Sequence, residues 1–71
     1  MKTVLNVEGM MCQNCERHVN EAIRKNFDVE SVVSDHGKNE TIVISNAPLD
    51  HEKLYKVIAD EDYELKGITE E

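Results

Sequence analysis

The chain has 71 residues, 39% of them apolar, and a formal net charge of −7. This length suits one small domain over residues 1–71, with too little core to enclose a deep active site, so we expect a protein that is not an enzyme. The acidic balance disfavours nucleic acid as a partner, because its phosphates require a basic face. No segment has the roughly 20 consecutive apolar residues of a membrane span, and the N-terminus lacks the apolar stretch of a secretion signal. We therefore expect a cytoplasmic protein without direct membrane insertion.

The first half of the chain predicts a strand, a loop and a helix. Leu5 and Val7 alternate with polar residues, which predicts a half-buried strand that ends at Gly9. A loop that contains two cysteines follows. Over residues 14–26 the apolar positions recur at helical spacing with charged residues between them, which predicts an amphipathic helix.

A β-hairpin is predicted next. Residues 29–35 are rich in valine, and residues 41–44 give the clearest strand signal in the chain. Residues 36–39 between them form the predicted turn, in which Gly37 and Asn39 are the residues that tolerate a positive φ.

The last part of the chain predicts a second helix and a short strand. Asp50 is a candidate N-cap, and the helix after it buries the apolar side chains of Leu54, Val57 and Ile58. Residues 63–67 alternate again and predict the final strand. The order β-α-β-β-α-β predicts an α+β, ferredoxin-like fold, with a four-stranded antiparallel sheet and two helices on one face.

The two cysteines, Cys12 and Cys15, form a Cys-x-x-Cys pair between the first strand and the first helix. The free N–H groups and positive dipole end of a helix start favour thiolate over thiol. Two thiolates on a tight turn can hold one soft cation, and Cu(I) is the cation that such ligands select. Zn(II) usually takes four protein ligands in a structural site, and the chain has no second cysteine pair. Zn(II), Cd(II) and Hg(II) stay open as alternatives.

The segment Gly9-Met10-Met11-Cys12-Gln13-Asn14-Cys15 fits the pattern Gly-Met-x-Cys-x-x-Cys, and Tyr63 follows the second predicted helix. On these residues the chain resembles, over nearly its whole length, the heavy-metal-associated domain family of copper chaperones and metal-transporting ATPase domains. The resemblance implies that Cys12 and Cys15 hold Cu(I) and pass it by ligand exchange to a P-type ATPase or another Cys-x-x-Cys acceptor. We expect a monomer, with a metal-bridged dimer as the alternative, because two exposed Cys-x-x-Cys sites could share one ion.

Five further residues are candidates for an auxiliary role at the metal. In the family, a Met at the position of Met10 packs under the metal loop, and a Tyr at the position of Tyr63 lies near the metal. Met11 stands where the family usually has Thr or Ser, and we expect it to be exposed, with a weak sulfur contact as the alternative. His18, one turn after the second cysteine, and Asp62, where the family usually has Gly, are the candidate extra ligands of a Zn(II) or Cd(II) site.

A remote alternative is thiol-disulfide exchange at the cysteine pair. Redox sites of that kind usually carry an aromatic residue before the first cysteine and a proline inside the pair, and Met11, Gln13 and Asn14 supply neither. This difference favours metal binding.

Several polar residues outside the motif depart from what we expect of the family. Ser34 and Asn26 occupy positions that are often apolar, and Asp28 replaces a common Gly, so we expect lower stability. The two histidines outside the first helix, His36 and His51, are expected to be solvated.

Overall fold

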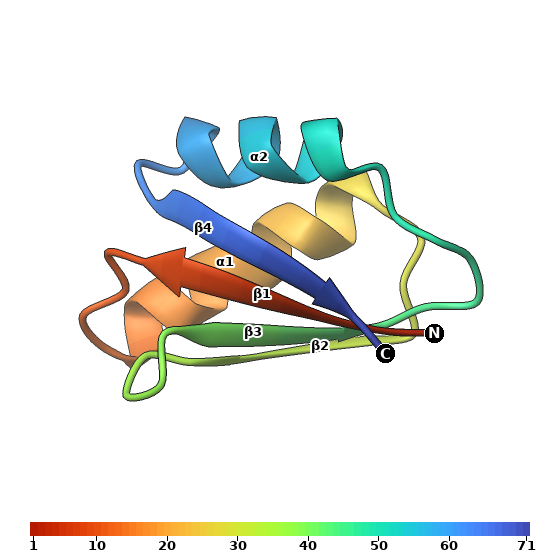
Figure 1. The fold of residues 1–71 in the computed structure, drawn as a ribbon. Coiled ribbons are helices and arrows are strands. Elements are labelled where there is room, and N and C mark those ends of the chain that lie inside the picture. The colour runs from red at the N-terminus through yellow and green to blue at the C-terminus, as the bar shows by residue number, and fades with distance from the viewer.

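The computed structural model describes all residues, 1–71, and its elements follow the predicted order. They are β1 (Lys2–Glu8), α1 (Gln13–Asn26), β2 (Ser31–Asp35), β3 (Glu40–Ile44), α2 (His51–Asp60) and β4 (Glu64–Glu70). Figure 1 shows one four-stranded sheet with both helices against the same face. The ferredoxin-like fold predicted from the sequence is thus confirmed. Neither helix has the length and apolar composition to span a membrane.

The sheet has the strand order β2-β3-β1-β4, and every neighbouring pair is antiparallel. The central strand β1 turns Thr3, Leu5 and Val7 toward the helices, where they are buried, and its other residues toward the open face. This alternation is the period-2 pattern of a strand with one buried face.

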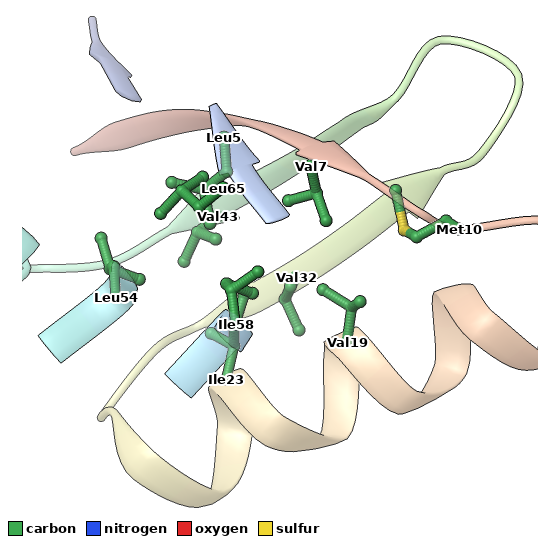
Figure 2. Close-up of a cluster of buried hydrophobic side chains, with 10 residues drawn as sticks. All are labelled: Leu5, Val7, Met10, Val19, Ile23, Val32, Val43, Leu54, Ile58 and Leu65. Carbon is green, nitrogen blue, oxygen red and sulfur yellow. The ribbon is translucent and has the colours of Figure 1, made fainter. Parts of the chain in front are cut away.

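A single apolar core fills the space between the sheet and the helices (Figure 2). Its ten buried side chains come from all six elements and the β1–α1 loop: Leu5, Val7, Met10, Val19, Ile23, Val32, Val43, Leu54, Ile58 and Leu65. The core therefore reaches from the sheet to the base of the cysteine loop, where it fixes the loop's starting point.

The second helix begins where the sequence predicts. The Asp50 carboxylate accepts hydrogen bonds from the backbone N–H groups of Glu52, at 3.0 Å, and Lys53, at 3.4 Å. Lys53 also joins the two helices, because its Nζ donates to the Asn26 carbonyl at 2.8 Å and lies 4.9 Å from the centre of the Phe27 ring. This ammonium contact with the last carbonyls of α1 offsets the negative end of the helix dipole.

Two strand boundaries and one turn differ from the prediction. β2 begins at Ser31, later than residue 29, and β4 continues to Glu70, beyond residue 67. β4 is longer because its residues pair with β1 as far as Glu70, which lies opposite Thr3. The alternation of apolar residues in the sequence does not indicate which strand will pair with which. In the β2–β3 turn Asn39 has a φ of 55°, as expected, whereas Gly37 does not adopt a positive φ.

Three loops meet at one end of the sheet, and the two chain termini lie at the other (Figure 1). The three are the β1–α1 loop with the cysteines, the β2–β3 turn and the α2–β4 loop. A backbone hydrogen bond of 2.8 Å from the Val7 N–H to the Asn39 carbonyl fastens the turn to the end of β1. The fold thus gathers residues from three separate parts of the chain around the cysteines.

A buried polar chain links α1 to the hairpin. The Ser34 hydroxyl donates to Asn20 Oδ1 at 2.6 Å, and it lies 2.9 Å from the Thr41 hydroxyl, which must then donate to it. Asn26 likewise satisfies its amide by donating to the Ala22 carbonyl at 2.7 Å. No buried side-chain nitrogen or oxygen lacks a partner. The buried Ser34 and the exposed Asn26 both form hydrogen bonds that the sequence alone did not reveal.

The Ser34→Ala variant should lower the free energy of unfolding by about 1–3 kcal/mol, because it leaves the Asn20 amide oxygen and the Thr41 hydroxyl without their partner. Urea unfolding followed by circular dichroism measures this change. The double variant Ser34→Ala/Thr41→Val should recover part of the loss, since both ends of one hydrogen bond are then apolar. A Ser34→Ala protein as stable as the parent would contradict this account of the polar chain.

Candidate metal centre

The cysteine loop depends on a close contact between Gly9 and Tyr63. Gly9 has a φ of +106°, and a Cβ placed on it would lie 3.1 Å from Tyr63 Cδ1 and 3.7 Å from Tyr63 Cα. Both the backbone conformation and the lack of space therefore require glycine. Because of this contact, the β1–α1 loop lies directly against the α2–β4 loop.

Both cysteines lie at the start of α1, and neither forms a disulfide. Cys12 is the N-cap residue with extended backbone, and its side chain makes no capping hydrogen bond. Its carbonyl instead accepts from the N–H groups of Cys15, at 3.1 Å, and Glu16, at 3.2 Å. The two thiols are unbridged, with 3.9 Å between the sulfur atoms; Cys12 is exposed and Cys15 half-buried.

Hydrogen-bond donors acidify one of these thiols. The pKa of Cys15 falls from 9.0 to about 7, first because the Met11 backbone N–H donates to the sulfur and then because the Tyr63 hydroxyl does, while desolvation opposes the change. The same bond, together with burial and the negative charge of the thiolates, raises the pKa of Tyr63 to about 12. Tyr63 therefore stays protonated and acts as a donor to a Cys15 thiolate.

The other predicted auxiliary residues lie in different environments. Met10 is 5% exposed and belongs to the core beneath the loop, whereas Met11 is 83% exposed. His18 and Asp62 are exposed, and Asp62 has a φ of 66°, a conformation that explains a preference for Gly at this position. No three His, Cys, Asp or Glu side chains converge on a space that could hold a metal ion. The structure thus brings the two cysteines and Tyr63 together but does not gather His18 and Asp62 into a ligand set with them.

Both histidines expected to be solvated are exposed, and each is also paired with a glutamate. His36 Nδ1 lies 2.6 Å from Glu16 Oε2, which also accepts the His36 backbone N–H at 2.8 Å. These contacts hold the pKa of Glu16 below its usual value, the backbone hydrogen bond being the largest cause. His51 Nε2 lies 2.7 Å from Glu70 Oε1. Both imidazoles are therefore exposed as expected, and the sequence did not reveal their glutamate partners because these lie far away along the chain.

Only the topology could have indicated the Glu16–His36 pair. In the order β1-α1-β2-β3, the turn after β2 returns to the end of the sheet at which α1 begins (Figure 1). His36 therefore arrives beside the first turn of α1, although twenty positions separate it from Glu16.

Comparisons with known proteins agree with this geometry. The profile of the family described as "Heavy-metal-associated domain" matches residues 4–64. Among solved structures, the oxidized MerP from Ralstonia metallidurans CH34 has a TM-score of 0.76 and 30% identity, and the match covers 94% of this chain and 97% of that one. A CopZ metallochaperone has a TM-score of 0.80 and 24% identity over 92% and 98% of the two chains.

A further similar structure is the N-terminal domain of ZntA in its Zn(II) form, with a TM-score of 0.80 and 22% identity over 92% of this chain and 88% of that one. At this level of identity the likeness concerns the fold. Curated protein sequences give no match.

The lowered pKa of Cys15 predicts how the reactivity of its thiol depends on pH. In the reduced, metal-free protein, the rate at which Cys15 is alkylated by iodoacetamide should rise with a midpoint near pH 7, because its pKa is about 7. Tyr63→Phe should move this midpoint upward, since it removes a donor to the thiolate. Mass spectrometry of the labelled peptides measures it, and Tyr55→Phe, at an exposed tyrosine of α2, is the matched control. Equal midpoints for Tyr63→Phe and the parent would contradict the assigned hydrogen bond.

The lowered pKa of Cys15 also makes the stability of the folded protein depend on pH. The folded-state pKa of Cys15, about 7, lies below the ordinary value of 9.0. The Cys15 thiolate therefore adds to the free energy of unfolding in full above pH 9.0. This contribution decreases as the pH falls toward 7 and is lost below it.

Proposed function

This chain belongs to the heavy-metal-associated domain family, and on that premise we propose that it binds one Cu(I) ion through Cys12 and Cys15 and transfers it to a partner protein. The observation that carries the proposal is the pair of free sulfur atoms 3.9 Å apart at the exposed start of α1. One ion bonded to both at a typical metal–sulfur distance of about 2.3 Å fits between them. Membership of the family supports the binding of a heavy metal in general. That this metal is Cu(I) is part of our proposal.

The donor set supports a soft monovalent ion. Thiolates select Cu(I), and the Met11 N–H and the Tyr63 hydroxyl favour the thiolate form of Cys15. No group of three or more His, Cys, Asp or Glu side chains is placed to hold a metal ion together, so the two sulfurs are the proposed ligands. A Zn(II) ion would need further ligands to complete four-coordination.

The exposure of the site supports transfer rather than storage. Cys12 is exposed, while Cys15 is half-buried and hydrogen-bonded to Tyr63, so an incoming thiolate reaches the metal from the Cys12 side. It bonds to the ion before the bond to Cys12 breaks, and the metal moves without being released into water. The metal keeps its charge throughout, and the leaving thiolate remains on this chain.

A partner with its own exposed Cys-x-x-Cys pair fits this exchange. Among the similar proteins, CopZ is a metallochaperone and the ZntA structure is the N-terminal domain of a protein in its Zn(II) form. We therefore propose a metal-transporting P-type ATPase or another Cys-x-x-Cys protein as the acceptor. The proposed setting is the reducing cytoplasm, where thiols stay free. The proposed carrier is a monomer, and two copies that share one ion would be a transfer intermediate.

An anaerobic titration of the reduced protein with Cu(I), against a competing chromophoric chelator, tests the function. We expect one tightly bound ion per chain, and loss of tight binding in Cys12→Ser and in Cys15→Ser, because a single thiolate cannot hold the ion against the chelator. Met11→Thr changes the exposed neighbour of Cys12 but no proposed ligand, and it should bind like the parent. A reduced parent protein that yields its Cu(I) to the chelator would overturn the proposal.

A further inference from the structure

The open face of the sheet, turned away from both helices (Figure 1), carries apolar side chains at positions that are usually polar. Val4, Ile42 and Val33 lie directly opposite one another across β1, β3 and β2, and each points to this face by the alternation of its strand. Ile44 is the next residue of β3 on the same face. None of the four is buried, and Val33 is 62% exposed. We call these four residues the open-face patch.

A shallow hollow of about 350 Å³ lies beside the open-face patch. Its lining includes Val4, Thr69 and Glu40, and also Lys38, which forms no salt bridge. Gly67 lines the hollow without a side chain, and a Cβ placed on it would meet no atom within 4 Å. Its φ is not positive, so the backbone does not require glycine here. The missing side chain therefore leaves a space next to Glu40 that a side chain from another molecule can enter.

Two carboxylates next to the open-face patch have no cation. Asp35 of β2 and Glu40 of β3 lie directly opposite each other on this face, and like charges in that position destabilise a sheet. Neither of them forms a salt bridge. Glu8 and Glu64 are also opposite each other, but the Lys66 Nζ lies 3.9 Å and 3.2 Å from their carboxylate oxygens. The chain thus compensates one like-charge pair itself and leaves the other uncompensated.

We propose that the open face of the sheet is a docking surface for a partner protein that presents aliphatic side chains beside a Lys or Arg. The aliphatic side chains pack on the open-face patch. The stem of the Lys or Arg enters the hollow at Gly67, and its charged head pairs with Glu40, which both lines the hollow and belongs to the uncompensated pair. This pairing also relieves the repulsion between Glu40 and Asp35.

The charge of the surface selects this occupant. A second copy would bring the same two carboxylates and a further net charge of −7, and nucleic acid or an anionic membrane would bring phosphates, so all three are repelled. A basic partner is attracted. The inference goes beyond the proposed function and does not depend on the metal, because Cys12 and Cys15 lie in the loop at one end of the sheet and stay accessible while the open face is occupied.

A peptide titration followed by NMR tests this inference. The probe is a pentapeptide, blocked at both ends, in which an arginine lies between two valines with a leucine at each end. The control peptide has glutamate in place of the arginine. Added to the ¹⁵N-labelled, reduced protein, the arginine peptide should cause saturable shifts of the amide resonances of β1, β3 and β4 around the hollow. The resonances of Cys12 and Cys15 should not move, and the glutamate peptide should cause no saturable shifts.

Three variants identify the site. Gly67→Val places a side chain in the hollow and should weaken binding of the arginine peptide by at least about tenfold, because the space is then occupied. Glu40→Gln should weaken it about twofold to fivefold, the range of an exposed ion pair. Glu64→Gln removes a carboxylate of the same face that Lys66 already compensates, so this matched control should bind like the parent.

Circular dichroism checks that each variant is folded, and an open strand position should accept valine. If Gly67→Val does not fold, Glu40→Gln and the control peptide still decide the question. Absence of saturable shifts with the arginine peptide, equal binding of the two peptides, or binding by Glu40→Gln or folded Gly67→Val as tight as that of the parent would each overturn the inference. Failure of the parent to bind Cu(I) would instead overturn only the proposed function.

Discussion

The close approach of the β1–α1 loop to the α2–β4 loop, with Gly9 against Tyr63, is the constraint on which the candidate site depends. A Cβ at Gly9 would lie 3.1 Å from the tyrosine ring, and the φ of +106° is one that other residues rarely adopt, so any other residue would strain this contact. Their contact puts the Tyr63 hydroxyl next to Cys15 and lets the buried Met10 side chain fix the loop onto the core. The position of one glycine thus connects the packing of the sheet to the chemistry of a thiol.

The two cysteines have different surroundings, and their difference suits exchange. Cys15 is half-buried and receives donors from the Met11 backbone and from Tyr63, which stabilise its thiolate. The side chain of Cys12 is exposed and makes no capping hydrogen bond. In the proposed transfer, Cys15 is therefore the ligand that keeps the ion in place while Cys12 is the ligand that an incoming thiolate replaces.

Local patterns predicted most of this structure. The alternation around Leu5, the helical spacing of the next segment and the Asp50 cap each depend on neighbours close in sequence, and each is confirmed. The cysteine pair was evident for the same reason. The contacts that sequence reasoning did not predict depend on distant partners: His36 is held by Glu16, and Ser34 by Asn20 and Thr41. Such contacts exist only once α1 packs beside β2, and no periodicity in the sequence reports them.

The central claim of this account is that one chain holds Cu(I) with two thiolates. X-ray absorption at the copper edge of the monomeric, Cu(I)-loaded protein tests it most directly, because it counts the donor atoms and identifies their element. The account predicts two sulfur donors at a single distance and no nitrogen. Three or more sulfurs, or a nitrogen donor in the copper form, would contradict it.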